Sequence, residues 1–291
     1  MKILISDAFD ASLPGKLAKY GDVTDDKNEL KDADVVLVRS KTKCTKEYID
    51  SAPNLKLIIR GGVGLDNIDR VYAKEKGITV HNTAEASAIA VAELATALMM
   101  AMPCNIIPGD SSMKEGKWLK KELKRTEVNG KILGLMGVGN IGTEVAKRAK
   151  ALGMDVIAYD PYIKAHDYAD MVAGLDDFIS RCDYISLHMP LTDETRGMVN
   201  KDLIAKMKDG VRIINTGRGK CVNEDDVAEA LKSGKIAGFS TDVWYSDPPE
   251  SSPLLNAPNV IATPHIGAST KENLLRIGEV IDRLIGMFVS K

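Results

Sequence analysis

Short apolar runs alternate with segments of helical periodicity over the first part of the chain. The runs have the length of buried strands, and the segments between them place apolar residues at helical spacing. This alternation predicts a parallel sheet with helices on both faces. The predicted strands are residues 2–6, 34–39, 55–60 and 79–82, and the predicted helices are residues 12–20, 46–51 and 69–76.

The pattern changes after residue 85. Residues 86–102 are rich in Ala, Leu and Met and predict one long buried helix, which crosses between domains or forms a dimer contact. Residues 110–125 are basic and polar, and we interpret them as a solvated face. Further strands are predicted at residues 184–188, 212–216, 237–243 and 259–263, and a closing helix at residues 271–289.

A glycine motif at residues 137–142 lies between two predicted strands, residues 132–136 and 154–159. Its G-x-G-x-x-G spacing, directly after a strand and at the start of a helix, is the fingerprint of dinucleotide binding. The first glycine permits a tight turn, the second lets the backbone approach a pyrophosphate, and the third lets the helix pack on the strand. The residues expected to contact the cofactor here are Gly137, Gly139, Asn140, Ile141 and Gly142.

An acidic residue ends the second strand of this unit. Asp160 lies 18 residues after the last glycine, close to the spacing of about 20 at which an acid binds the adenosine ribose. Its negative charge would repel a 2′-phosphate, so the sequence predicts NAD rather than NADP. The alternative is that Asp160 only begins the turn at Pro161.

Polar residues also follow the later predicted strands. Because the carboxyl ends of parallel strands meet at one edge of an open sheet, we expect these residues to line the cofactor crevice. Packing alone does not explain polar residues at several successive strand ends. The residues predicted to contact the cofactor in this way are His188, Pro190, Thr195, Thr216, Gly217, Arg218, Asp242, His265 and Gly267.

Composition narrows the class of protein. The 291 residues suggest two domains, and the net charge of -2 provides no electrostatic case for binding nucleic acid or an anionic membrane. No apolar stretch is long enough to span a bilayer, and the first residues resemble a strand rather than a signal peptide. The 4 cysteines show neither metal-ligand nor C-x-x-C spacing, so we expect free thiols, no metal site and a cytoplasmic location.

His265 is distinguished among the 4 histidines by its position. It follows the last predicted strand of the cofactor unit, in a loop that Pro264 and Gly267 hold in place. An isolated loop histidine is usually without function, but a strand end at the crevice is where a reacting group is expected. His265 is therefore a candidate for proton transfer.

These residues lie among further motifs that occur in a fixed order. The chain resembles the D-2-hydroxyacid dehydrogenases, and within that family its motifs are most similar to those of D-3-phosphoglycerate dehydrogenases. The resemblance extends over nearly the whole chain. The motifs that carry it are residues 39–42, 60–69 and 82–85, the glycine motif, and residues 218–219, 241–244 and 263–267.

The resemblance implies two doubly wound parallel-sheet α/β domains. A flavodoxin-like substrate-binding domain, residues 1–98 and 270–291, is interrupted by a Rossmann NAD-binding domain, residues 99–269. The active site is expected in the cleft between the domains, whose closure would expel water from the reacting carbons. A homodimer formed through the cofactor domain, with the helix near residues 90–100 involved, is also implied. We further expect a short form without the regulatory domain that many phosphoglycerate dehydrogenases append.

The resemblance also implies the roles of three residues. His265 would be the general base in oxidation, since imidazole suits proton transfer in both directions, and Arg218 would orient the substrate carboxylate. An acid bonded to the second imidazole nitrogen would determine its tautomer. The family normally supplies glutamate there, whereas the matching position of this chain is Asp247. Glu250 is the alternative if the loop is shifted.

Two loops of the first domain are candidates for substrate binding. The glycine-rich turn that begins at Arg60 is expected to present backbone N–H groups to the substrate carboxylate. The basic residues Arg39 and Lys41 follow a predicted strand and are expected to face a second anionic group such as a 3-phosphate, although a solvated loop is the alternative. The predicted substrate-binding residues are Arg39, Ser40, Arg60, Val63 and Gly64.

The leading interpretation is NAD-dependent oxidation of D-3-phosphoglycerate to 3-phosphohydroxypyruvate, a step of serine biosynthesis. Hydroxypyruvate and glyoxylate reductases, and other D-2-hydroxyacid dehydrogenases, are compatible with the same features. NAD-binding corepressors are a different class that shares the fold, but they would be expected to carry partner-binding segments that we do not find. Formate dehydrogenases also share the architecture, with a His–Gln pair rather than His–Asp.

Overall fold

The computed structural model describes residues 1–290 and divides into two compact units. Unit 1 comprises Met1–Ala88 and the C-terminal segment from Ala268, and unit 2 comprises Ile89–Gly267. The sequence placed the two crossings further along the chain, after residues 98 and 269. The first crossing lies inside one continuous helix, Ala84–Ala101, and no residue pattern marks the point at which such a helix changes packing partners. Lys291, which ends the expected substrate domain, lies outside the described residues.

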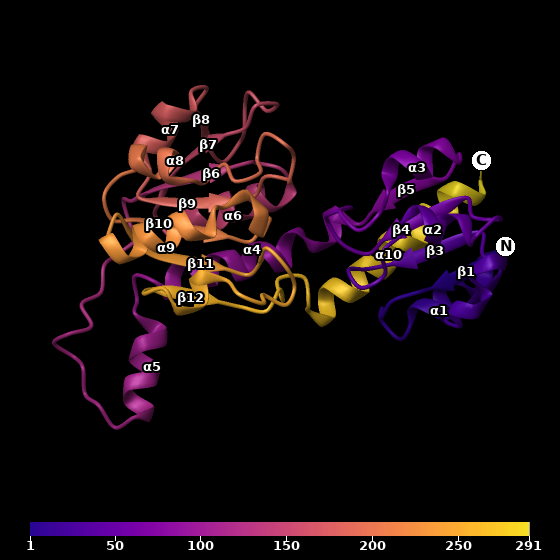
Figure 1. The fold of residues 1–291 in the computed structure, drawn as a ribbon, viewed down its shortest axis with the longest axis horizontal. Helices are drawn as coiled ribbons and strands as arrows, with labels where there is room; N and C mark the ends of the chain where they lie inside the picture. Colours follow the sequence, from indigo (N-terminus) through magenta and orange to yellow (C-terminus); the bar gives the residue numbers. More distant parts are fainter. Residues whose placement is uncertain (291) are drawn as a thin grey trace. The chain divides into compact units, whose positions relative to one another are not determined.

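Unit 1 is built on a five-stranded parallel sheet (Figure 1). Its strands are β1 Lys2–Ile5, β2 Asp22–Thr24, β3 Val35–Val38, β4 Leu57–Arg60 and β5 Thr79–Asn82. Their spatial order, β2-β1-β3-β4-β5, is that of a flavodoxin-like sheet. The sequence predicted every strand here except β2, a three-residue edge strand with no apolar run.

Helices cover both faces of this sheet. They are α1 Leu13–Leu17, α2 Lys46–Asp50, α3 Arg70–Glu75 and α10 Lys271–Val289, with 3-10 turns η1 Ala18–Tyr20 and η2 Lys27–Asp32. α1 and α10 contribute to one core cluster, and α2 and α3 contribute to the other. β3 divides its side chains between the two clusters, because successive residues of a strand point to opposite faces. Both faces of the strand are therefore apolar.

Unit 2 contains a seven-stranded parallel sheet. Its strands are β6 Ile132–Met136, β7 Asp155–Tyr159, β8 Asp170–Met171, β9 Tyr184–Leu187, β10 Val211–Asn215, β11 Ile236–Thr241 and β12 Val260–Ala262. In space they run β12-β11-β10-β9-β6-β7-β8. The chain leaves β6 toward β7 on one side and later returns to β9 on the other, so the strand order reverses between β6 and β9. In open α/β sheets, ligands bind beyond the carboxyl ends of the strands at such a point.

Two layers of helices bury this sheet. The helices are α4 Ala84–Ala101, α6 Asn140–Ala151, α7 Leu175–Arg181, α8 Lys201–Lys206 and α9 Glu224–Ser233, with 3-10 turns η3 Gly219–Cys221 and η4 Pro253–Asn256. A further helix of this unit, α5 Ile106–Lys114, contributes no residue to the two core clusters. α4 and α6 contribute to one core cluster, whereas α7, α8 and α9 contribute to the other. The two sheets together confirm the predicted fold class of two doubly wound parallel-sheet α/β units.

α4 corrects an expectation from the sequence. By length and composition alone it is a helix that can cross a membrane, whereas no apolar stretch of that length was expected. However, 50% of that window is buried inside the protein, and Ala92, Ala95 and Leu98 pack in the core of unit 2. This is the arrangement of a core helix.

The helix α5 was not predicted, because it combines two isoleucines with a polar stretch that we interpreted as a solvated face. Figure 1 shows α5 and the extended segment that follows it lying apart from the helices that cover the sheet of unit 2. Large apolar side chains are exposed along this part of the chain, among them Ile106, Met113 and Trp118. The segment is therefore not only a solvated face.

Candidate active site

The glycine loop between β6 and α6 has the shape that a pyrophosphate requires. Gly137 has a φ of 92°, in the left-handed region that favours glycine. A Cβ on Gly142 would lie 2.4 Å from the Gly137 carbonyl oxygen, so only glycine permits this approach of helix and strand. A Cβ on Gly139 would meet nothing within 4 Å, which leaves open space for a phosphate group. Asn140 and Ile141 form the first turn of α6.

The N-terminus of α6 opens onto this space. Gly139 is its N-cap residue and has no side chain to accept a bond from the helix, so the first N–H groups are available to an anion. Asp160, at the end of β7, accepts a bond from the Val138 N–H at 3.2 Å with one oxygen and from the Tyr162 N–H at 2.9 Å with the other. Asp160 thus anchors the glycine loop through Val138. The carboxylate itself lies at the position in the motif where an acid binds the cofactor ribose. These features fit a bound NAD.

His188 follows β9 and packs against the first glycine, since a Cβ on Gly137 would lie 3.0 Å from the His188 carbonyl carbon. The Nε2 of His188 lies 2.8 Å from the Ser186 hydroxyl, whereas its Nδ1 is buried with no hydrogen-bond partner among the described residues. Burial lowers the pKa of His188 to about 4, so the ring is neutral at physiological pH. Beyond it, the Thr195 hydroxyl closes a turn by donating to the Pro190 carbonyl at 2.7 Å.

The loop after β10 presents Arg218 on a defined backbone. The Asn215 side chain accepts a bond from the Gly217 N–H and donates one to the Arg218 carbonyl, both at 3.1 Å. Thr216 is buried between them, and its hydroxyl has no partner in the described part of the chain. A buried hydroxyl without a partner costs free energy, so a ligand that bonds to Thr216 would be stabilised.

Trp244 connects this loop with the two loops beside it. A Cβ on Gly219 would lie 2.2 Å from the Trp244 backbone, so the two segments are in direct contact. The Trp244 indole N–H donates to the Thr263 carbonyl at 3.1 Å. The loops that follow β10, β11 and β12 are therefore packed against one another at the carboxyl edge of the sheet.

Asp242, the first residue after β11, holds the His265 loop. It is only 2% exposed and accepts bonds from the Thr263 hydroxyl at 2.6 Å and from the N–H groups of Ile266 and Gly267 at 2.8 Å each. Bonds to a charged acceptor are stronger than neutral ones. His265 lies between these bonded residues with a φ of 53°, a left-handed conformation that a residue other than glycine adopts only where its surroundings determine it.

The imidazole of His265 bonds to Asp247. The Nδ1–Oδ2 distance is 2.5 Å, and the two side chains are 46% and 50% exposed. Because a carboxylate can only accept, Nδ1 carries the proton and Nε2 is left to exchange a proton with a ligand. Within residues 1–290 no bond joins the ring to Glu250, the alternative acid.

The predicted substrate residues of unit 1 lie at the carboxyl edge of its own sheet. β3 and β4 are neighbours with Val38 opposite Arg60, so Arg39 and Arg60 stand at the ends of adjacent strands. Arg39 is partly buried, whereas Ser40 beside it is exposed. The two arginines are thus placed by strand register rather than by proximity in sequence.

The turn after Arg60 is closed by its own contacts. Gly62, with a φ of 149°, lies against the Arg60 guanidinium, and a Cβ there would sit 1.8 Å from Nη1. The Asn82 side chain donates to the Val63 carbonyl at 2.6 Å, and Gly64 follows in the same turn. The Val63 carbonyl is therefore occupied, and the Gly62 N–H is occupied as well, because it donates to the Thr83 hydroxyl at 2.8 Å.

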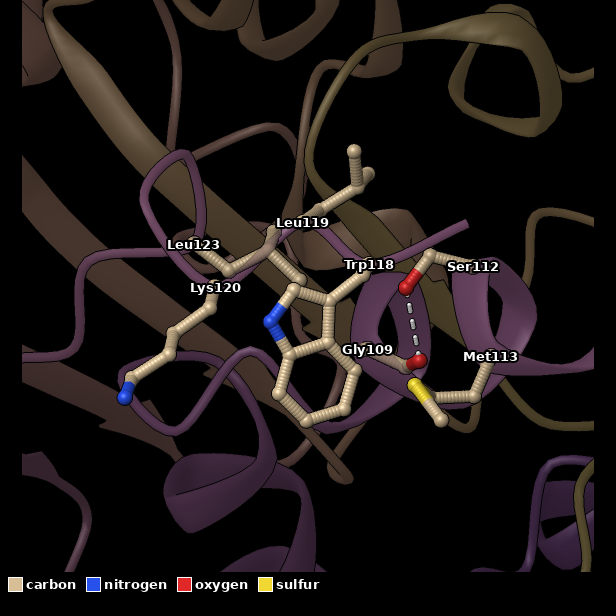
Figure 2. Close-up of a pocket in the computed structure, with 7 residues that line it drawn as sticks. All are labelled: Gly109, Ser112, Met113, Trp118, Leu119, Lys120 and Leu123. Carbon is tan, nitrogen blue, oxygen red and sulfur yellow. Dashed lines mark hydrogen bonds between the residues drawn. The ribbon is translucent and has the colours of Figure 1, made fainter. Parts of the chain in front are cut away.

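A cavity of about 410 Å³ lies apart from all these strand ends, between α5 and the residues that follow it. Figure 2 shows the Trp118 indole facing Met113, with the Ser112 hydroxyl bonded to the Gly109 carbonyl at 2.9 Å. None of the predicted cofactor or substrate residues lines this cavity. It is a feature of the α5 segment and not of the strand-end site.

The sequence did not point to three residues that organise these loops. Thr263 donates to Asp242, Asn215 holds the backbone of Arg218, and Asp7 bonds to the segment that begins at Arg39. Each is a polar residue at or beside the end of a predicted strand. That same signal had pointed to Asp242, and applied consistently it would have found them.

Known proteins resemble this chain in sequence. Residues 96–267 match the family model of the D-isomer specific 2-hydroxyacid dehydrogenase, NAD binding domain. Over 259 residues the chain is 50% identical to the hydroxypyruvate reductase of Thermotoga maritima, covering 88% of this chain and 85% of that protein. Over 257 residues it is 46% identical to the D-3-phosphoglycerate dehydrogenase of Methanocaldococcus jannaschii, covering 87% of this chain and 49% of that protein. The chain thus spans about half the length of the phosphoglycerate dehydrogenases that it matches.

Solved structures agree with the sequence comparison. The D-lactate dehydrogenase of Aquifex aeolicus, complexed with NAD and lactic acid, is similar with a TM-score of 0.87 at 32% identity, over 100% of this chain and 96% of that one. The glycine loop, the order of the strands and both sequence matches lead to the same family. The chain therefore belongs to the D-2-hydroxyacid dehydrogenases and is an NAD-dependent oxidoreductase.

Proposed function

We propose that the protein oxidises D-3-phosphoglycerate to 3-phosphohydroxypyruvate with NAD, as a step of serine biosynthesis in the cytoplasm. Arg39 is the observation that carries the choice of a phosphorylated substrate. The Arg39 side chain is partly buried, and Nη1 donates to the Ala8 carbonyl at 3.4 Å. Among residues 1–290, Nε has no partner and no carboxylate forms an ion pair with the guanidinium. Burial lowers the pKa of Arg39, and the nearby charge of Asp7 offsets this only in part. A partly buried cation without an ion-pair partner favours a ligand with a second anionic group.

A second candidate is the reduction of hydroxypyruvate or glyoxylate. It is favoured by the match to the Thermotoga maritima hydroxypyruvate reductase, of which the chain covers 85%, against 49% of the Methanocaldococcus jannaschii phosphoglycerate dehydrogenase. The cytoplasmic location, common to both candidates, is supported by four cysteines that are free thiols.

In the proposed reaction, His265 takes the hydroxyl proton of the substrate at Nε2, because Asp247 keeps the other proton on Nδ1. NAD, when bound, supplies the acceptor for the hydride that leaves the same carbon. Arg218 provides a planar cation that orients the substrate carboxylate, and the Asp247 charge stabilises the imidazolium that forms. In unit 1, the N–H groups of Val63 and Gly64 would bind the carboxylate as well.

One set of assays decides the substrate. NADH formation is followed with D-3-phosphoglycerate, D-glycerate and D-lactate, and NADH consumption with hydroxypyruvate and glyoxylate. We expect phosphoglycerate to have the highest kcat/KM among the hydroxy acids. If phosphoglycerate is inert while an unphosphorylated acid is oxidised, the proposed substrate is wrong and the reductase takes its place.

Substituting Asp247→Asn should lower kcat by about tenfold to a hundredfold, because the amide no longer stabilises the charged ring or determines its tautomer. The measurement is steady-state kcat with the best substrate. Glu250→Gln, at an exposed acid three residues on, is the matched control and should leave kcat unchanged.

We also propose a homodimer that forms through the cofactor unit. The sequence had placed residues 90–100 of α4 at the contact, but most of their apolar side chains are used in the protein's own core. The α5 segment offers more free apolar surface, with Trp118 73% and Met113 57% exposed beside the cavity in Figure 2. Exposed apolar surface of this kind is typical of an interface between protein chains.

Substituting Trp118→Glu should shift the protein toward monomer, since it would place a charge within the proposed contact. The molar mass in solution, from light scattering coupled to size-exclusion chromatography, reports the change. Val71→Glu is the control, because Val71 in unit 1 is 72% exposed, close to the exposure of Trp118. A monomeric wild type, or a dimer that Trp118→Glu leaves intact, would contradict this interface.

A further inference from the structure

The loop of residues 39–42, which follows β3, is held at its N–H groups by one carboxylate. Asp7, just beyond β1, accepts bonds from the backbone N–H groups of Arg39 at 2.6 Å and Thr42 at 3.1 Å through the same oxygen. Its other oxygen accepts the Thr42 hydroxyl at 2.6 Å. Because β1 and β3 are neighbouring strands, Asp7 reaches the loop across the sheet edge.

The carbonyl groups of the same loop are held by one amide. The Asn67 side chain donates from Nδ2 to the carbonyl oxygens of Arg39 at 2.8 Å and Thr42 at 2.6 Å. Both partners are acceptors, so the orientation of the amide is unambiguous. Asn67 is itself anchored, because its own carbonyl accepts the N–H of the buried Cys44 at 2.8 Å. The two ends of the 39–42 loop are therefore bonded on both their N–H and carbonyl sides.

We propose that Asp7 and Asn67 are positioning residues that hold the 39–42 loop in the conformation from which Arg39 binds the second anionic group of the substrate. This role rests on the proposed function, in which Arg39 meets that group. Neither residue touches substrate; both act through the backbone of the loop.

The chemistry of Asp7 suits this role. Burial by itself would raise the pKa of Asp7, but the bonds from Thr42 and from the Arg39 N–H outweigh it, and the pKa lies below its ordinary value. Asp7 is therefore ionised at neutral pH. Its oxygens are engaged by the loop, and no ion pair to the Arg39 guanidinium is formed in the described structure. The guanidinium keeps its charge for a ligand.

Hydrogen exchange tests the positioning directly. Asp7→Asn removes the charge of the oxygen that accepts both N–H groups, so both bonds weaken and the amides of Arg39 and Thr42 should exchange about tenfold faster than in the wild type. Asn67→Asp places an acceptor opposite two carbonyl oxygens and should have the same effect. Asp10→Asn is the matched control, because the Asp10 carboxylate bonds to Ser12 at the start of α1 and not to the 39–42 loop in the described structure. Unchanged exchange in both loop variants would overturn the proposal.

Kinetics test whether the position matters for the substrate. With the holoenzyme, Asp7→Asn should raise the KM for D-3-phosphoglycerate about tenfold with kcat within about twofold, which is the signature of lost ground-state binding. The KM for D-glycerate, which lacks the second anionic group, should not change. Thr42→Val should act in the same direction as Asp7→Asn, and Thr42→Ser should restore the wild-type KM.

Arg39→Ala separates the phosphate contact of Arg39 from the positioning role of Asp7 and Asn67. If it leaves the KM for phosphoglycerate unchanged, the proposed phosphate contact fails, whatever Asp7 does. If Arg39→Ala raises that KM while Asp7→Asn and Asn67→Asp do not, the positioning role fails and the contact stands. If phosphoglycerate is not oxidised at all, the substrate half of the proposal falls with the proposed function, and hydrogen exchange alone decides the rest.

Discussion

Substituting His265→Asn should lower kcat by about 10²–10⁴-fold in both directions, the range that a general acid or base contributes. Asparagine tolerates the left-handed φ of 53° that His265 adopts, so the loop should keep its shape. Asparagine cannot take up or release a proton near neutral pH, and this loss is the physical reason for the effect. The measurements are steady-state kcat with the best substrate and NADH affinity from fluorescence titration, which should stay nearly unchanged.

The control for this substitution is another exposed imidazole. His81 lies on β5 in unit 1, and His81→Asn should leave kcat unchanged. A His265→Asn enzyme with wild-type kcat would assign the proton transfer to another group. A loss of NADH binding equal to the loss of rate would instead make His265 a cofactor contact, which the sequence also proposed.

Substituting Asp242→Ala should disorder the loop that carries His265. Three donors would lose a buried acceptor, which costs about 2–3 kcal/mol in the free energy of unfolding and lowers the Tm by about 5–10 °C. The displaced imidazole should lower kcat by about 100-fold, as misplacement by about 1 Å can do. Thermal unfolding and kcat measure the two effects separately.

A graded pair of variants controls the Asp242 prediction. Thr263→Val removes one of the three donors and should have a smaller effect on both Tm and kcat, with Asp242→Asn between the two. If Asp242→Ala changes only the affinity for NAD and leaves Tm intact, Asp242 acts as the cofactor contact that the sequence predicted. If nothing changes, the three bonds have no energetic consequence.

The strands were predicted well where they are apolar and central. β3, β4, β6 and β9 are buried on both faces of a parallel sheet, and such strands read as continuous apolar runs. The two missed strands, β2 and β8, are short and lie at sheet edges. An edge strand needs little apolar surface, so its sequence carries no run to detect. The short helices α7 and α8 have too few turns for a clear period.

The glycine loop could be read from sequence because its contacts are local. Gly137, Gly139 and Gly142 act on one turn and one helix start, and Asp160 ends the next strand. Because these steric requirements act over so few residues, they produce the G-x-G-x-x-G spacing that is recognisable in the sequence. The same holds for the preference for NAD, which depends on the charge at a single position.

Contacts between distant segments were decided only by the tertiary structure. Asp247 rather than Glu250 bonds to His265, because the packing of Trp244 and Thr263 determines which part of that loop reaches the ring. The 39–42 loop is held from β1 on one side and by Asn67 on the other. The sequence by itself determined the two sheets, the glycine loop and the family, since these depend on local periodicity and local sterics. The bonds that position Arg39 and His265 depend on where separate strands end in space, and only the folded sheet determines that.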